Sequence, residues 1–183
     1  DYVKHFESQI KQSIRFATGP FFWFIPDNTQ SRITAVSDNV STQTPCSLDE
    51  WLNADIHFFT NLIHPDDRYY LLSSIQKAME LFESMPLQKR ECIGLNIYSR
   101  MMNKDKEYVW KLIQFPGLYF NDNNKVEAAM LMVTEIQHIG HISNTMMTII
   151  DNTNQSFKFY KISTENKLID TQIPKLSNRE MQV

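Results

Sequence analysis

The sequence has few of the residues that mark several common functional classes. Four scattered glycines among 183 residues leave no phosphate-binding P-loop and no dinucleotide-binding fingerprint. The two cysteines, Cys46 and Cys92, are too few for a disulfide scaffold and lack the CxxC spacing of zinc sites. No apolar run is long enough to span a membrane, and no signal-peptide pattern opens the chain. We therefore expect a cytoplasmic protein.

The chain also lacks an excess of positive charge. Lys and Arg number 18 against 21 Asp and Glu, which gives a formal net charge of −3. Tight binding to a phosphate backbone depends on clustered Lys and Arg that release counterions. We therefore expect this stretch to bind DNA poorly by itself. Its length and its 42% hydrophobic content suit one folded domain with small appendages.

An apolar stripe is present at the start of the chain. Val3, Phe6, Ile10 and Ile14 recur at steps of three and four, which predicts an amphipathic helix within residues 1–18. The stripe needs a covering surface, and either the chain's own sheet or the same helix of a second copy would provide one. The sequence does not decide between them, so these four residues are candidates for a dimer interface.

The remaining pattern alternates short extended segments with helices, and the segments are joined by polar turns. Ser47 and Glu50 fit a capping box at one helix start, and Pro65 suits the first position of the longest helix. The expected order is strands at 21–25 and 31–37, short helices at 47–52 and 55–63, a long helix at 65–84, an antiparallel meander at 90–101, 107–120 and 125–136, a further hairpin at 146–150 and 157–162, and a polar linker at 163–175.

This order of elements resembles that of PAS domains, and four short stretches agree with the resemblance. Residues 63–68, Ile-His-Pro-Asp-Asp-Arg, are similar to the signature of the subclass called the third PAS fold family. The other stretches are Phe-Trp-Phe-Ile-Pro-Asp at 22–27, Ala-Val-Ser-Asp-Asn-Val at 35–40 and Val-Thr-Glu-Ile at 133–136.

The resemblance implies an α+β PAS-like sensory domain over residues 19–137. Its expected form is a five-stranded antiparallel sheet with helices on one face, preceded by the N-terminal amphipathic helix and followed by an extra C-terminal β-hairpin. Residues 138–175 would form a connecting hairpin and linker.

Residues 176–183, Leu-Ser-Asn-Arg-Glu-Met-Gln-Val, are similar to the opening of a LuxR-type helix-turn-helix domain. Ser177 and Glu180 form a second possible capping box there, although a plain terminal helix start would look the same. Together the two resemblances imply the signal-sensing domain of a bacterial LuxR-type transcription regulator, truncated at the start of its DNA-binding part. Such a domain would couple a small-molecule or partner cue to DNA binding, act as a homodimer, and contact DNA only through the missing helix-turn-helix.

Apolar side chains of the expected sheet and helices are candidates for a ligand pocket. They would lie between the long helix and the sheet, where they equally well make an ordinary core. The sequence names no ligand for such a pocket. The candidates are Phe22, Phe24, Phe58, Phe59, Ile97, Trp110, Leu112 and Met132.

Known PAS cofactors are not expected. Cys46 lies in Thr-Pro-Cys-Ser, unlike the Asn-Cys-Arg-Phe context that light-sensing flavin domains place around their reactive cysteine. The long helix carries no His that would serve as an axial haem ligand. His138 and His141 lack a third ligand with suitable spacing, so we expect no metal site.

No catalytic residues are expected either. His64, Asp66 and Asp67 lie at a helix start, where carboxylates stabilise the helix dipole without any catalytic role. No GxSxG nucleophile motif occurs. Two alternatives stay open beside the regulator: a ligand-free PAS dimerisation module, and a small enzyme of the cone-shaped ketosteroid-isomerase type. The enzyme would need a buried acid that the strands do not obviously supply.

Overall fold

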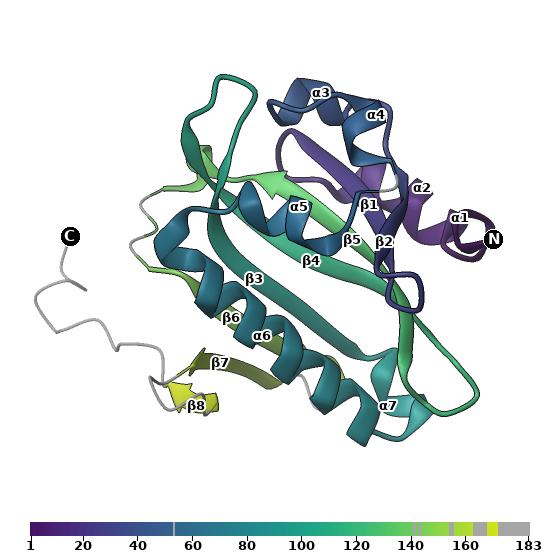
Figure 1. The fold of residues 1–183 in the computed structure, drawn as a ribbon. Helices are drawn as coiled ribbons and strands as arrows, with labels where there is room; N and C mark the ends of the chain where they lie inside the picture. The colour runs from purple at the N-terminus through teal and green to yellow at the C-terminus, as the bar shows by residue number, and fades with distance from the viewer. Residues whose placement is uncertain (53, 141, 143, 154–155, 163–167, 172–183) are drawn as a thin grey trace, which may run out of the picture.

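A single antiparallel sheet forms the centre of the computed structural model, which describes residues 1–52, 54–140, 142, 144–153, 156–162 and 168–171 (Figure 1). Eight strands follow one another across it in the order β2-β1-β5-β4-β3-β6-β7-β8. In chain order they are β1 (Phe21–Asp27), β2 (Arg32–Val36), β3 (Ile93–Met102), β4 (Tyr108–Phe120), β5 (Val126–Glu135), β6 (Met146–Asp151), β7 (Ser156–Ile162) and β8 (Leu168–Thr171).

Helices lie on both sides of this sheet (Figure 1). The long helix α6 runs along β3 on one side, and the N-terminal helices α1 and α2 lie behind the sheet. The helices are α1 (Tyr2–His5), α2 (Glu7–Phe16), α3 (Val40–Gln43), α4 (Leu48–Trp51), α5 (Ile56–Asn61), α6 (Pro65–Ser84) and α7 (Leu87–Arg90), with a 3-10 turn η1 at Gln137–Ile139. Among the described residues, no helix combines the length and the apolar character required to cross a membrane.

The strand register gives the sheet two distinct faces. On the face that we call inner, one row of apolar side chains crosses five strands and belongs to the main core together with Leu71 and Phe82 of α6. The residues adjacent to these in each strand lie on the opposite face, which we call outer. They form a second row, and three of its five side chains are polar. The inner row is Phe22, Val133, Ile113, Ile97 and Met147; the outer row is Trp23, Met132, Gln114, Asn96 and Thr148.

Local signals explain where the long helix α6 begins and ends. Pro65 occupies its first turn, and the His64 imidazole accepts a hydrogen bond from the Asp66 backbone N–H. After the helix, the Arg90 guanidinium donates hydrogen bonds to the carbonyls of Glu83 (3.2 Å) and Met85 (3.0 Å). These bonds satisfy carbonyls that lack partners at a helix end.

The predicted order of strands and helices and the antiparallel meander are confirmed, as is the α+β PAS-like class. Three details differ. The N-terminal helix is interrupted at Phe6, and α1 and α2 lie on the sheet face opposite to α6, so helices do not occupy one face alone. The sheet has eight strands instead of the predicted five, because β6 of the C-terminal hairpin pairs with β3, and β7 and β8 extend the sheet further. Within the expected linker, residues 168–171 form strand β8, whereas residues 176–183 lie outside the described part of the chain.

Candidate functional site

The space beneath the inner face is occupied by an aromatic cluster around Trp51. Its indole is fully buried, with ring centroids 5.3 Å from Phe22, 5.2 Å from Phe24 and 5.3 Å from Phe58. The indole N–H donates to the Thr44 hydroxyl at 3.2 Å, so the only polar atom of the ring is satisfied. The helix that carries Trp51 starts at the predicted capping box, which the structure confirms.

The eight predicted pocket residues do not surround one cavity. Phe22, Phe24, Phe59 and Ile97 are fully buried, and Phe58 packs against the same core. These five fill the interior instead of enclosing a space. The other three lie on the outer face, by the alternation of β4 and β5. They are Trp110, Leu112 and Met132.

Trp51 was absent from the predicted set although it is the centre of the inner cluster. A four-residue helix is too short to show a hydrophobic period, so periodicity gave no reason to choose it. The capping box was the available signal. It fixes the residue at which the helix starts, and therefore also the orientation of the residues in its first turn, Trp51 included.

The residues of the His-Pro-Asp-Asp motif fasten α6 to the end of β3. Asp67 is buried and accepts hydrogen bonds from the Arg100 backbone N–H (2.9 Å), Nε (3.0 Å) and Nη2 (2.7 Å). Burial alone would raise the pKa of Asp67, but the bonds from Arg100 outweigh it and lower the pKa below its ordinary value. The His64 backbone N–H donates to the Arg100 carbonyl at 2.9 Å. The contacts of this motif are therefore structural.

Helices α1 and α2 are fixed to the outer face through Phe6. This side chain is fully buried against Ile25, Ala128 and Met130. A Cβ atom at Gly117 of β4 would lie only 2.8 Å from its ring, so the absence of a side chain there allows the close approach.

A second anchor joins the first helix to strand β5. The Tyr2 hydroxyl donates to Glu127 Oε1 at 2.6 Å. That hydrogen bond, with burial second, raises the pKa of Tyr2 well above its ordinary value.

The apolar stripe of the N-terminal helices is therefore divided between two environments. Phe6 and Ile10 pack on the chain's own sheet, so Phe6 is not available to a second copy. Val3 is 42% exposed and Ile14 is 68% exposed, and both line an apolar groove beside β1 and β2 with a volume of about 620 Å³. The predicted dimer contact stays a prediction for Val3 and Ile14.

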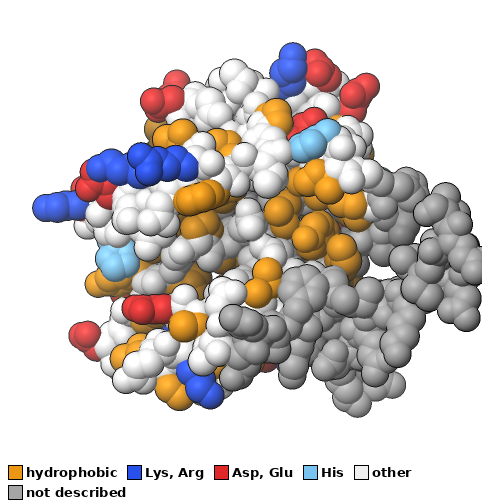
Figure 2. Space-filling view, turned by 180° about the vertical axis from the view of Figure 1, so that it is seen from behind, with side chains coloured by type: hydrophobic (Ala, Val, Ile, Leu, Met, Phe, Trp, Pro, Cys, Tyr) orange, Lys and Arg blue, Asp and Glu red, His pale blue; other side chains and the backbone are white. Residues whose placement is uncertain are grey.

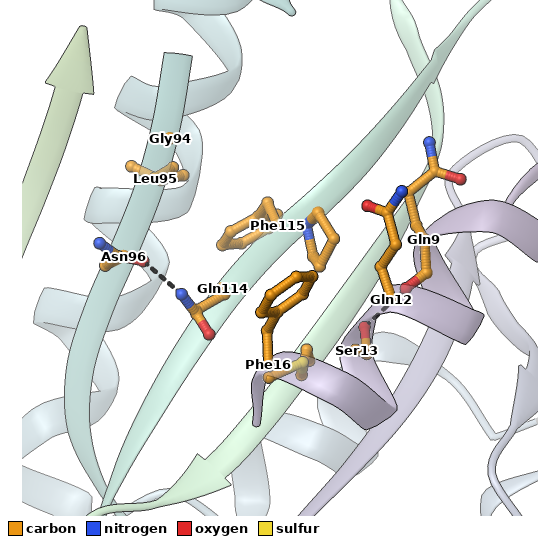
Figure 3. Close-up of a pocket in the computed structure, with 11 residues that line it drawn as sticks. Gln9, Gln12, Ser13, Phe16, Gly94, Leu95, Asn96, Gln114 and Phe115 are labelled. Carbon is orange, nitrogen blue, oxygen red and sulfur yellow. Dashed lines mark hydrogen bonds between the residues drawn. The ribbon is translucent and has the colours of Figure 1, made fainter. Parts of the chain in front are cut away.

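A second groove, on the other side of α2, is distinguished by the side-chain carboxamides in its lining. It lies between α2 and strands β3 and β4 and has a volume of about 280 Å³ (Figure 3). Four carboxamide side chains line it, and we call it the carboxamide groove. They are Gln9, Gln12, Asn96 and Gln114.

Hydrogen bonds fix the strand side of the carboxamide groove. Gln114 Nε2 donates to Asn96 Oδ1 at 2.9 Å, and Asn96 Nδ2 donates to Thr148 Oγ1 at 3.2 Å. The ladder thus runs from β4 through β3 to the buried Thr148 of β6. Phe16 and Met132 add apolar surface to the groove. Of its residues, only Met132 belonged to the predicted set.

Figure 2 shows apolar side chains gathered in the middle of the outer face, with charged side chains mainly around its margin. In the described part of the chain, no three His, Cys, Asp or Glu side chains come together as a metal site would require. The arrangement can therefore bind apolar and uncharged polar groups, by contacts from α2 and the central strands.

Comparison with known proteins places the fold. A family model described as PAS fold matches residues 33–130. The N-terminal domain of a diguanylate cyclase with PAS/PAC sensor from Marinobacter aquaeolei is similar, with a TM-score of 0.53 and 14% identity over 67% of this chain and 100% of that chain. A sensory box histidine kinase/response regulator from Burkholderia thailandensis E264 has a TM-score of 0.48 and 13% identity over 72% of this chain and 86% of that chain. No curated protein matches the sequence.

At 14% identity, the similarity to the Marinobacter aquaeolei structure shows the fold alone. The family model, in contrast, covers more than half of the chain, including β3, all of α6 and the His-Pro-Asp-Asp motif. The chain belongs to the PAS fold family of sensory domains.

Proposed function

We propose that this PAS domain is the regulatory part of a bacterial LuxR-type transcription regulator. It couples a cue to DNA binding by a helix-turn-helix that begins at residues 176–183. The similarity of that octapeptide to the opening of LuxR-type domains is the observation that carries the proposal. The continuous sheet from β3 through β6, β7 and β8 supports it, because it links the PAS core to the segment just before the octapeptide.

The structure favours the outer face as the place where the cue acts. The Trp51 cluster fills the inner side, which leaves the grooves beside α2 as the accessible surfaces. A molecule or partner bound there would favour one packing of α2 on the sheet. The hydrogen-bond ladder from Gln114 to Thr148 joins this surface to β6, so the bias would pass into the C-terminal hairpin.

DNA selection with the full-length protein tests the regulator proposal. Genomic fragments retained by the protein that includes the residues after Val183 are sequenced, and affinity for them is compared with random DNA at several salt concentrations. We expect sequence-specific binding that weakens steeply with salt, and no such binding by the chain 1–183 with its net charge of −3. Equal affinity of the full-length protein for selected and random DNA would refute the proposal.

A Thr148→Val substitution in the full-length protein tests the route through the hairpin. It removes the acceptor for Asn96 with little change of shape, and we expect DNA affinity to change about fivefold, the lower range of allosteric coupling. Thr153→Val, at an exposed turn position, is the matched control and should leave affinity unchanged. Wild-type affinity in both variants would show that the hairpin carries no coupling through this ladder.

The apolar groove supports a second candidate, a ligand-free PAS dimerisation module. Val3 and Ile14 leave apolar surface accessible along it, and a second copy would cover that surface. Solution mass of Ile14→Asp is compared with that of Ser8→Asp, which places the same charge on an exposed position of the same helix. A dimer that is lost only in Ile14→Asp supports this candidate, and equal masses for the two variants contradict it. Phe6→Asp would not discriminate, because Phe6 is buried in its own chain.

A further inference from the structure

We infer that the carboxamide groove binds a neutral, planar heterocycle of nucleobase size. Its place on the outer sheet surface, between α2 and strands β3 and β4, is separate from the interior between the sheet and α6 (Figure 3). The inference concerns binding by this chain itself and does not depend on the DNA-binding role proposed above.

The chemistry of the lining indicates an uncharged ligand with both donors and acceptors. None of the described residues that line the groove carries a charge, so a charged group entering it would lose hydration without a counter-charge. Each carboxamide carries an acceptor oxygen and two N–H donors, so Gln114, which donates one bond within the ladder, keeps its oxygen for a ligand. Asn and Gln form paired hydrogen bonds with the edges of bases for this reason. Asn96 and Gln114 are already held in position by the ladder that ends at Thr148.

The apolar part of the groove suits a flat ring. Phe16 at the end of α2 is 75% exposed, and its ring lines the groove together with that of Phe115 (Figure 3). Base-on-aromatic stacking contributes about 1–3 kcal/mol per base. The volume of about 280 Å³ lies just below the range of roughly 300–1,000 Å³ found for drug-sized ligands. A single ring system therefore fits better than a dinucleotide.

Gln9 supplies an independent reason for a ligand. Its Oε1 atom is shielded from solvent and has no hydrogen-bond partner among the described residues. A buried acceptor without a donor is unfavourable. Figure 3 shows this oxygen turned away from the Phe16 ring, so a ligand N–H would form the missing bond only after the Gln9 carboxamide rotates toward the groove.

Titration with nucleosides tests the inference. Adenosine, inosine, cytidine and uridine are added separately to the ¹⁵N-labelled chain 1–183, and backbone amide shifts are followed. We expect at least one nucleoside to give saturable shifts at α2, β3 and β4. No saturation with any of the four, or saturable shifts confined to α6 and α4, would overturn the inference.

A parallel titration with a single-stranded oligonucleotide identifies the source of the heterocycle. The net charge of −3 predicts that it binds no more tightly than the free nucleoside. Tighter binding at the same amides would keep the site and assign it to bases within a strand.

Three substitutions separate a ligand contact from a structural role. Gln9→Met keeps the length of the side chain and removes its unpartnered acceptor, so nucleoside affinity should fall about tenfold while the Tm stays level or rises. Phe16→Ala should lower affinity about tenfold through lost stacking. Ile14→Ala changes another exposed residue of α2 that lines the other groove, and should leave affinity unchanged. Equal affinities in all three variants, or a fall in Tm with Gln9→Met, would contradict the assignment.

Discussion

The two faces of this sheet are made by the same strands but differ in what they do. On the inner face, Phe22, Ile97 and their neighbours are closed in by α4, α5 and α6 around Trp51. On the outer face, Asn96 and Gln114 line a groove that is bordered, among the described helices, by α2 alone. The inner side therefore supplies stability, and the outer side is where we propose that recognition takes place, so substitutions on the two faces should have separable effects.

The largest effect is expected for Trp51→Ala on the inner face. Removal of this fully buried indole leaves a cavity among at least three aromatic rings and should lower the free energy of unfolding by about 3–5 kcal/mol. Urea denaturation of this variant is compared with that of Trp110→Ala on the outer face, where a half-buried ring should cost about 1–2 kcal/mol. A larger loss for Trp110→Ala would reverse the assignment of the two faces.

Asp67→Asn should have the next largest effect, because it leaves part of Arg100 buried without its charged partner. We expect a loss of about 2–4 kcal/mol in the free energy of unfolding. Asp66→Asn, at a largely exposed carboxylate of the same helical turn, is the control and should change it by less than about 0.5 kcal/mol. Similar losses in both variants would show that helix capping alone, rather than the bond to β3, explains the motif.

The same ion pair predicts a pH dependence. The pKa of Asp67 is lower in the folded chain than in the unfolded chain, where it is about 3.9. Its contribution is therefore fully present above that value and is lost as the pH falls through the folded-state pKa. The unfolding free energy of the wild type should decrease more steeply below about pH 4 than that of Asp67→Asn. Parallel pH profiles for the two proteins would be evidence against the linkage.

Gly117→Ala should affect the outer face alone. The new methyl group would lie 2.8 Å from the Phe6 ring, so α1 must shift, at a cost of about 1–3 kcal/mol. Hydrogen exchange should accelerate in α1 and α2 while α6 keeps its protection. Gly94→Ala is the matched control in a neighbouring strand, because its methyl group would meet Ile150 at an ordinary 3.6 Å. Unchanged exchange in Gly117→Ala would show that Phe6 is not what holds these helices.

The smallest effect on stability is expected for Phe16→Ala. This ring is mostly exposed, so its removal should change the free energy of unfolding by less than about 0.5 kcal/mol and leave the Tm almost unchanged. A clear loss of stability, measured by thermal unfolding, would place Phe16 among the structural residues and remove it from the recognition surface.

The sequence was sufficient to predict α6 and the meander because their signals are local. Pro65 and the carboxylates after it mark a helix start, and the apolar residues up to Phe82 keep a helical period. Strand β3 and the first part of β4 alternate between more and less buried residues, and the turns that join β3 to β4 and β4 to β5 contain left-handed residues at Lys106 and Asn124. Pairing between neighbours along the chain is the common outcome for such segments.

The candidate site could not be predicted in the same way because it depends on contacts distant in the sequence. Strands β4 and β5 carry apolar residues on both faces, since α2 covers part of the outer one, so Met132 could not be assigned to a face by hydrophobicity alone. The apolar stripe of α2 indicated that another surface covers it, but the sequence did not indicate which surface. The carboxamide groove requires both the position of α2 and the register of Asn96 with Gln114.

The pairing of β6 with β3 has a mechanical consequence for whatever follows β8. Neighbouring strands lie about 4.8 Å apart, so the three strands added beyond β3 carry the outgoing chain roughly 14 Å sideways from the PAS core. A lateral arm of this length converts a slight change of sheet twist into a larger displacement of its far end. In the regulator proposed above, strands β6 to β8 would act as a lever as well as a connection, and shortening them should reduce the movement that a cue at α2 would produce.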